Sequence, residues 1–410
     1  MKTPRNTRRI VRTAAIAGAA GALVLSTLTA CSNDKDKAGG PTTDLPTSAA
    51  AGEAIKIGLI GSGGGVVSIP QLTKGGEAAA KYLNDNAGGI NGHRVDLIVC
   101  NQHEDPASAT KCANEMVEKK VAVVAVPMTS QGAVMLPIVA RAGIPYVSQA
   151  PVSAVEMGAP GGYMLSGGTV AVLNGQAQTA AKEGVKKFTI LIGDSGDAAA
   201  SVGQMAQAFF KPAGIDVKVV TIPSNVADPT PQISAGLADK PDAVTVLGDS
   251  RQCVSSLKAL KTAAPQVKKY LIASCLDKTV TDNVGTDAVE GAKSFTTVIT
   301  TGDDPTVVRY RSVLAKYSPD VDPNGLAYLG YQVISSIGEV GKSLPAGPIT
   351  AKQYTDALRA AQNVPVPAAP GLTFTCNGKA FPKAPNLCSK SILVSEVGAD
   401  GKLSNSTVVN

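Results

Sequence analysis

The chain has 410 residues, with 38 Lys or Arg and 32 Asp or Glu, which gives a formal net charge of +6 at neutral pH. Five of the basic residues lie in the first twelve positions, so the rest of the chain is nearly neutral and has no basic stripe with interleaved aromatic side chains. This pattern argues against nucleic acid as a partner, and two histidines without a Cys-x-x-Cys pair argue against a metal site.

The N-terminus has the features of an export signal. A basic segment precedes the apolar run 14–28, which is too short to span a bilayer. The run ends in a Leu-Thr-Ala-Cys sequence that resembles the lipobox of bacterial lipoproteins, with ordinary secretory cleavage as the alternative. We expect residues 1–31 to be a lipoprotein signal peptide and lipobox, with lipid on Cys31 anchoring the protein at the extracytoplasmic face of the cell membrane. An Arg-Arg pair in the basic segment leaves the choice between twin-arginine and general secretion open.

The composition changes after this signal. Residues 32–53 are rich in Ser, Thr, Pro, Gly, Asp and Lys, and they cannot bury enough apolar surface to offset the entropy of ordering. This segment is predicted to be a flexible tether. The remaining stretch of more than 350 residues is too long for one hydrophobic core and predicts two lobes.

Cysteine usage fits an exported protein. Apart from Cys31 there are six cysteines, and they fall into pairs that are close in sequence. Six cysteines allow 15 connectivities, so the predicted pairing rests on proximity and on the expected elements. The predicted disulfides are Cys100 with Cys112, Cys253 with Cys275, and Cys376 with Cys388.

From residue 54 onward, short β-branched runs alternate with helical patterns, which is typical of α/β folds with parallel sheets. Strands are expected at 55–60, 94–100, 121–126, 146–148, 188–192, 217–221, 243–247 and 270–273. Helices are expected at 73–86, 107–119, 132–142, 170–183, 201–210, 230–238 and 252–262. Three further helices, at 305–317, 326–343 and 351–362, break the alternation, and the tail is expected to form short strands closed by a cysteine-bounded loop.

Three segments carry a family resemblance. Residues 55–60, the Asn-x-x-Gly-Gly-Ile-Asn-Gly-like segment 87–95, and Gly-Ile-Pro-Tyr-Val-Ser at 143–148 resemble substrate-binding proteins of ABC importers for branched-chain amino acids and related molecules. The resemblance implies a type I periplasmic binding fold, in which two Rossmann-like lobes are joined by three crossings, here near 164–168, 296–300 and 368–373. It assigns 54–166 plus 300–368 to the N-terminal lobe and 167–299 plus 369–410 to the C-terminal lobe.

The glycine-rich loop after the first strand raises the question of a dinucleotide site. The third glycine of G-x-G-x-x-G would fall at Val66, and the second strand ends without the expected acid, so no nucleotide cofactor is predicted. The resemblance instead places Ser62 and Gly63 in the ligand cleft. Thr129 and Ser130 precede a predicted helix, where Ser130 can cap the helix or donate to a ligand carboxylate.

The other candidate ligand contacts also lie at strand ends, where open α/β sheets bind ligands. The resemblance points to the strand-end segments that contain Gln149, Ala150, Val152 and Ser153 in the first lobe and Asp197, Asp249, Ser250 and Asp277 in the second. Ser153 is the candidate to replace a family threonine, and Asp249 or Asp277 is the candidate to pair with a ligand ammonium, with solvated loop aspartates as the alternative. Val152 stands where the family has a threonine, and the family's aromatic and acidic contacts fall on Ala198 and Cys275. These departures leave the ligand open, and we expect a small polar molecule such as an amino acid or an amide.

An enzyme is not expected. A Ser-His-Asp arrangement would have to use His93 or His103, and no G-x-S-x-G elbow precedes a helix. We expect a monomeric receptor that needs no cofactor and delivers its ligand to ABC permease subunits by closure of the cleft. A sensor of the same fold that signals to a membrane partner is the alternative, and a secreted hydrolase is the least favoured one.

Overall fold

The structure is a computed structural model that describes residues 44–65, 68–193, 197–223, 226 and 228–410. The predicted signal peptide, Cys31 and the tether up to residue 43 lie outside these residues. Within the described part, no helix is long and apolar enough to cross a membrane.

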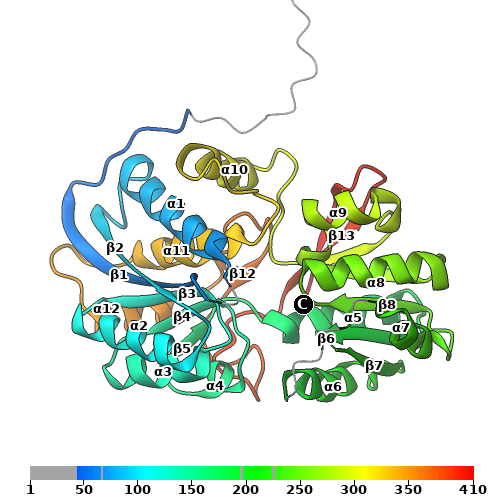
Figure 1. Cartoon of the computed structure of the whole chain (residues 1–410). Helices are drawn as coiled ribbons and strands as arrows, with labels where there is room; N and C mark the ends of the chain where they lie inside the picture. Colours follow the sequence, from blue (N-terminus) through cyan, green and yellow to red (C-terminus); the bar gives the residue numbers. More distant parts are fainter. Residues whose placement is uncertain (1–43, 66–67, 194–196, 224–225, 227) are drawn as a thin grey trace, which may run out of the picture. The chain divides into compact units, whose positions relative to one another are not determined.

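A first sheet is built from parallel strands in the order β2-β1-β3-β4-β5 (Figure 1). Its central strand β3 has residues 123–127 all buried, as expected where helices cover both faces of a sheet. The strands are β1 (Gly52–Ser62), β2 (His93–Gln102), β3 (Val123–Met128), β4 (Tyr146–Ala150) and β5 (Gly162–Met164). The helices between them are α1 (Pro70–Asn86), α2 (Pro106–Glu118), α3 (Gly132–Arg141) and α4 (Ala154–Gly158).

A second sheet has seven strands in the order β14-β13-β10-β9-β8-β6-β7, of which the last two along the chain are antiparallel additions. The strands are β6 (Lys187–Gly193), β7 (Asp216–Ile222), β8 (Ala243–Leu247), β9 (Lys268–Ile272), β10 (Lys293–Thr296), β13 (Ile392–Val397) and β14 (Leu403–Val409). Its helices are α5 (Gly168–Lys182), α6 (Asp197–Phe210), α7 (Thr230–Leu237), α8 (Ser250–Ala263) and α9 (Lys278–Val284). We call this sheet with its helices the C-terminal lobe. The two-lobed α/β fold predicted from the sequence is confirmed.

Three later helices return to the first sheet and complete the N-terminal lobe: α10 (Pro305–Tyr317), α11 (Ala327–Gly341) and α12 (Ala351–Ala360). Helix α11 packs against α1 with backbones in close approach. A Cβ atom at Gly330 would lie 1.9 Å from the Leu72 carbonyl oxygen, and one at Gly75 would lie 2.0 Å from the Ala327 carbonyl oxygen. Glycine is therefore required on both sides of this contact.

The third crossing between the lobes comes later than the sequence predicted. After the short ribbon of β11 (Val364–Pro365) and β12 (Thr373–Phe374), the chain stays with the N-terminal lobe. Met164 of β5 donates to the Asn386 carbonyl at 2.9 Å, and the Cys388 N–H donates back to Met164 at 2.8 Å. The chain enters the second sheet only at β13, so the expected crossing at 368–373 and the assignment of 369–388 to the C-terminal lobe are wrong. Backbone pairing with β5, which the sequence pattern does not reveal, holds this stretch.

The boundary of the predicted tether at residue 53 is also too late. The Ser48 N–H donates to the Asp85 carbonyl at 3.1 Å, and the Ala50 N–H donates to the Asn84 carbonyl at 2.7 Å. The Asn86 side chain reaches the Pro46 carbonyl at 2.6 Å. The Asn86 side chain and backbone pairing from Ser48 therefore fasten the chain to the end of α1 from Pro46 onward, although its composition resembles a linker.

The three predicted disulfides are all present. The Cα–Cα distances are 5.6 Å for Cys100–Cys112, 5.1 Å for Cys253–Cys275 and 4.3 Å for Cys376–Cys388. The first joins β2 to α2, the second joins α8 to the short 3₁₀ helix η1 (Ala273–Cys275), and the third closes the excursion before β13. Each bridge links neighbouring elements, which is why proximity in sequence predicted the pairing.

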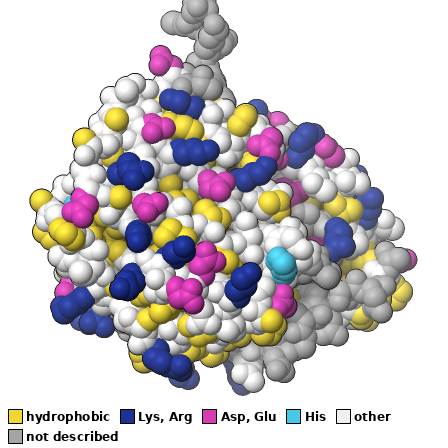
Figure 2. All heavy atoms as spheres, turned by 60° about the vertical axis from the view of Figure 1, so that its left-hand side comes forward, with side chains coloured by type: hydrophobic (Ala, Val, Ile, Leu, Met, Phe, Trp, Pro, Cys, Tyr) yellow, Lys and Arg dark blue, Asp and Glu magenta, His cyan; other side chains and the backbone are white. Residues whose placement is uncertain are grey.

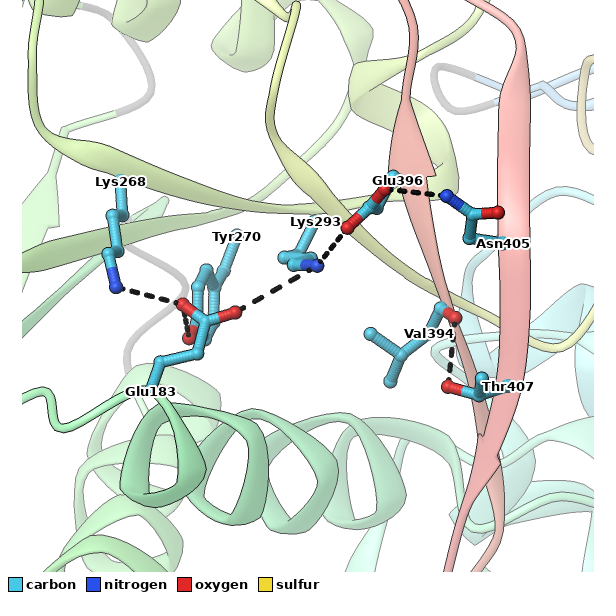
Figure 3. Close-up of polar contacts among 8 residues, drawn as sticks. All are labelled: Glu183, Lys268, Tyr270, Lys293, Val394, Glu396, Asn405 and Thr407. Atoms are coloured by element: carbon cyan, nitrogen blue, oxygen red, sulfur yellow. Dashed lines mark hydrogen bonds and ion pairs between the residues drawn. The ribbon is translucent and has the colours of Figure 1, made fainter.

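A polar network fastens the antiparallel strands to the rest of the second sheet (Figure 3). Glu183, just after α5, accepts a 3.0 Å hydrogen bond from the Tyr270 hydroxyl of β9. Lys293 of β10 lies 3.9 Å from Glu183 and 2.7 Å from Glu396 of β13, and Asn405 of β14 donates to Glu396 at 2.8 Å. Burial and the Glu183 carboxylate raise the pKa of Tyr270, so its hydroxyl stays a donor.

Charged side chains of both signs are interspersed over the face shown in Figure 2. The exposed ion pairs of the described residues include Lys352–Asp356 at 2.6 Å within α12 and the pair of Lys74 with Asp320. Exposed pairs of this kind contribute about 0–1 kcal/mol each, so they add solubility more than stability.

Candidate functional site

The carboxyl ends of the strands in the N-terminal lobe form one continuous edge. Ser62 of β1 is paired in register with Gln102 of β2, and Met128 of β3 is paired with Ala150 of β4. Ser62 is fully buried, and the Gly63 N–H donates to the Gln102 carbonyl at 2.9 Å. The glycine-rich loop therefore continues the β1–β2 pairing for one more residue before turning toward α1.

Thr129 and Ser130 come together at this edge, and a carboxylate is bound to them. It belongs to Glu104, in the loop between β2 and α2. Its Oε2 accepts hydrogen bonds from the Ser130 N–H at 2.8 Å, the Ser130 hydroxyl at 2.5 Å and the Thr129 hydroxyl at 3.2 Å. Its Oε1 accepts from the side-chain amide of Gln102 at 2.5 Å. The donors expected for a ligand carboxylate are thus occupied from within the chain.

Sequence reasoning missed Gln102 and Glu104. In sequence, the loop that contains Glu104 resembles an ordinary helix-capping loop, and Asp105 does cap α2 by accepting the N–H groups of Ala107 and Ser108 at 2.9 Å each. A capping aspartate gives no sign that the residue before it reaches back to the end of β3. The one feature of the sequence that could have indicated Glu104 is that it is an acid next to the capping residue Asp105.

The exit of β4 is organised by a buried carboxylate on α4. Ser153 caps α4, and Glu156 completes a capping box with it. The Glu156 carboxylate accepts from the Val152 N–H at 3.1 Å, the Ser153 N–H at 3.0 Å and the Tyr146 hydroxyl at 2.9 Å. Burial raises the pKa of Glu156 despite these bonds. The hydroxyl of Ser153 has a structural role, whereas the side chain of Val152 is 47% exposed at the strand end.

Gln149 lies near the end of β4, and its side chain is fully buried. Its side-chain amide donates to Gln332 Oε1 of α11 at 2.9 Å. The amide of Gln332 donates in turn to the carbonyls of Thr297 at 2.7 Å and Pro367 at 2.8 Å, and the Ser166 hydroxyl donates to the Gln149 carbonyl at 2.6 Å. This hinge network joins the first two crossings to the segment before β12.

In the C-terminal lobe the candidate acids cap helices. Asp249 caps α8 by accepting the Gln252 N–H at 2.9 Å, and Asp277 caps α9 by accepting the Val280 N–H at 2.8 Å. The Ser250 hydroxyl donates to the Asp277 carboxylate. Asp197 begins α6, and its side chain lies outside the described part of the structure.

Ser250 and Asp277 share a cavity of about 350 Å³. Its other walls come from the start of α1, from Ser274 and Lys278, and from the loop 320–326 before α11. Lys278 is paired with Asp282 at 2.6 Å and Asp320 is paired with Lys74, so Asp277 and Asp322 are the two lining aspartates that make the cavity acidic. The loop 320–326 was not among the candidates from the sequence, because its Asp and Pro residues resemble an ordinary turn.

The candidate residues therefore form three groups: Ser62, Gly63, Thr129 and Ser130 at the β1–β3 edge, Ala150, Val152 and Ser153 at the exit of β4, and Ser250 with Asp277 in the cavity. Gln149 belongs to the hinge network.

The histidines have structural surroundings. Both ring nitrogens of His93 lie near backbone carbonyls, 3.0 Å from that of Glu53 and 2.9 Å from that of Pro345. The His103 N–H donates to the Ser108 hydroxyl at 2.9 Å. Among the described residues, no group of three or more His, Cys, Asp or Glu side chains is placed to hold a metal ion.

Comparisons with solved structures find the same fold at low sequence identity. The leucine binding protein LivK from Thermotoga maritima is 18% identical, with 87% of this chain and 99% of that chain covered and a TM-score of 0.69. LivJ from Streptococcus pneumoniae, solved with isoleucine, is 17% identical, with 87% and 99% covered and a TM-score of 0.68. An ABC transporter solute binding protein from Rhodopseudomonas palustris, solved with p-hydroxybenzoic acid, is 19% identical, with 86% and 95% covered and a TM-score of 0.69.

No curated protein matches the chain. A family model described as periplasmic binding protein matches residues 54–384, which is most of the chain and includes every strand of the first sheet except the start of β1. The chain belongs to the periplasmic binding protein family.

Proposed function

We propose that this protein is a lipid-anchored solute receptor that binds a small polar molecule between its lobes and delivers it to an ABC importer by closure of the cleft. The observation that carries the proposal is the cavity of about 350 Å³ in which Ser250 and Asp277 face the start of α1 and the loop 320–326. The C-terminal lobe contributes polar groups that follow its strands, and the N-terminal lobe contributes the start of α1 and a helix-connecting loop. Open α/β sheets bind their ligands beyond the carboxyl ends of the strands.

The chain path supports a hinge. Three crossings join the lobes, and the hinge network of Gln149 and Gln332 ties the first two of them to the segment before β12. A few residues between two rigid lobes can absorb the backbone changes of a closure motion. A receptor that closes around its ligand presents a different surface to a membrane partner in each state.

The ligand class follows from the lining. The cavity is acidic and contains hydroxyl groups, and Val152 offers an exposed apolar surface at the exit of β4. A buried cation requires a partner charge, so Asp277 is suited to an ammonium group or another donor of the ligand. Amino acids, amides and related amines are the compounds to examine first.

The anchor belongs to the same proposal. Lipid on Cys31 and a tether that ends near Pro46 would keep the receptor close to a permease and raise its effective concentration there. A sensor that signals to a membrane partner would use the same parts, and genes for two permeases and two ATPases beside its own would favour transport.

Mass spectrometry of the protein extracted from membranes tests both parts. Under denaturing conditions the mature chain should begin at Cys31 and carry the mass of the attached lipid. Under native conditions a fraction of molecules should carry a bound small molecule that is lost on denaturation. A mature chain that begins elsewhere without lipid would contradict the anchor, and a chain that never carries a ligand from any growth medium would count against the receptor.

A further inference from the structure

Glu104 is not among the residues that line the cavity, yet its carboxylate is held by a full set of donors at the strand ends of the N-terminal lobe. Four donors from Gln102, Thr129 and Ser130 reach it, and they come from the ends of β2 and β3. In the described part of the chain, no ion pair includes Glu104. The carboxylate is therefore held entirely by neutral hydrogen-bond donors.

The surrounding groups fix Glu104 in place. Its N–H donates to Gln102 Oε1 at 2.6 Å, so the fully buried amide of Gln102 bonds both the backbone and the carboxylate of the same residue. The Gln131 side chain donates to the Glu104 carbonyl at 3.3 Å and to the Ser130 hydroxyl at 3.0 Å. The Thr129 hydroxyl also accepts from Gln102 at 3.1 Å and from the Gln131 N–H at 2.9 Å. With the Glu104 carboxylate in this position, each of these donors has an acceptor.

The backbone of Glu104 is in the left-handed region, with a φ of 57°. A residue with a branched or long side chain adopts this conformation at a cost, which glycine avoids. The hydrogen bonds of the carboxylate offset that cost, so the side chain and the backbone conformation depend on each other.

We propose that Glu104 is a specificity residue that fills the anion-binding position at the ends of β2 and β3 and thereby excludes ligands that carry a carboxylate at this point. This inference deepens the proposed function and rests on it. A carboxylate-bearing ligand would have to displace Glu104 from four donors or lie beside a like charge, and like charges in one site disfavour each other. The part of the ligand that faces Glu104 is a neutral or cationic hydrogen-bond donor, such as an amide or an ammonium group.

Chemical rescue tests the position without knowledge of the natural ligand. Glu104→Gly removes the carboxylate and relaxes the left-handed backbone, so the variant should fold while Ser130 and Thr129 lose their acceptor. Exchanging sodium chloride for roughly 200 mM sodium acetate at constant ionic strength should raise the melting temperature of this variant by roughly 2 °C, because acetate binds the folded state alone. Acetamide, which has the same shape without the charge, should give a clearly smaller rise.

The wild-type protein and Glu118→Gly are the controls. Glu118 is an exposed residue at the end of α2, so the same substitution there removes a carboxylate that holds no such network. Neither control should respond to acetate. Absence of rescue in Glu104→Gly, or an equal response in the wild-type protein, would overturn the assignment.

Matched pairs of ligands test the exclusion itself. L-leucine with L-leucinamide, and 4-hydroxybenzoate with 4-hydroxybenzamide, differ only in the carboxylate. If the wild-type protein binds either acid, Ser130→Ala should leave that affinity unchanged. An acid that binds and loses about tenfold or more of its affinity in Ser130→Ala would mean that Glu104 leaves the site, which contradicts the inference. If no compound of any class binds but acetate rescues Glu104→Gly, the receptor proposal fails while the assignment of Glu104 stands.

Discussion

Glu156 illustrates how single residues hold the strand ends in position. Its carboxylate is buried and bonds the Val152 and Ser153 N–H groups and the Tyr146 hydroxyl. Through its backbone carbonyl it also accepts the side-chain amide of Asn386 at 2.8 Å, which belongs to the excursion closed by the third disulfide. One side chain therefore fixes the exit of β4, and its backbone holds the tail against the N-terminal lobe.

The raised pKa of Glu156 predicts a pH dependence of stability. Burial places the pKa of Glu156 in the folded state above the ordinary value of 4.5. The proton that Glu156 binds more tightly in the folded state therefore stabilises the fold. This contribution to the free energy of unfolding is fully present below pH 4.5 and is lost as the pH rises through the folded-state pKa. Glu156→Gln cannot titrate. The variant should be less stable overall by about 1–3 kcal/mol because the amide accepts fewer hydrogen bonds.

Thermal unfolding of both proteins between acid and neutral pH measures this effect. The wild-type advantage over Glu156→Gln should shrink as the pH rises, whereas exposed Glu118→Gln should give a gap that hardly varies. A gap for Glu156→Gln that widens with pH would contradict the assigned direction.

At the residue scale, sequence patterns located the groups but not their partners. Thr129 and Ser130 were placed correctly before a helix, because the end of a buried strand followed by hydroxyl residues is a local pattern. Their partner Glu104 lies about 25 residues earlier in the chain, and only the order of β1 to β3 in the sheet brings the two loops together. The partner of Gln149 could not be predicted for the same reason, since Gln332 is 183 residues away.

At the scale of elements, the contact between α1 and α11 builds the N-terminal lobe from distant parts of the chain. Thirteen of the fifteen residues of α11 are buried, and the helix axes can approach because glycines lie on both sides (Figure 1). The contact joins the first described helix, α1, to a helix that follows strands β6 to β10 of the C-terminal lobe. It therefore makes the N-terminal lobe depend on the second crossing.

A pair of glycine substitutions tests this contact. Gly330→Ala places a methyl group 1.9 Å from the Leu72 carbonyl oxygen, so the helices must separate, and the free energy of unfolding should fall by about 3 kcal/mol. Gly203→Ala is the matched control, because nothing lies within 4 Å of a Cβ atom there and the residue is inside α6.

The control should raise stability by about 0.5–1 kcal/mol through the higher helix propensity of alanine. Chemical denaturation measures both effects. Equal and small changes in the two variants would mean that α1 and α11 are not in close contact.

Local signals predicted most elements and failed where pairing is long-range. The helix expected at 305–317 has the observed bounds because Asp304 caps it and Pro305 occupies its first turn. Strand β8 was also predicted with its observed bounds, since five consecutive buried residues mark it. The short elements β5 and α4 were missed, because three and five residues carry too little periodicity.

At the scale of the whole molecule, the two lobes contribute different groups to the candidate site. The N-terminal lobe provides a polar edge that Glu104 fills and an apolar side chain at Val152, and the C-terminal lobe provides Ser250 and Asp277. The hinge network lies where the crossings leave the N-terminal lobe. Together these features support the proposed receptor for a small molecule that carries hydrogen-bond donors.

The most direct test of that receptor is a melting-temperature panel of amino acids, amides, ureas, amines, sugars and aromatic acids. The panel is measured on the mature chain with Cys31→Ser, in the wild-type background and with Asp277→Asn or Asp304→Asn. Asparagine at position 277 still caps α9 but removes the charge of that side chain from the cavity, whereas Asp304 caps α10 and lies outside the cavity lining. At least one compound should raise the melting temperature, and this gain should be largely lost in Asp277→Asn and kept in Asp304→Asn. A panel without any gain, or a gain that Asp277→Asn leaves unchanged, would contradict the account.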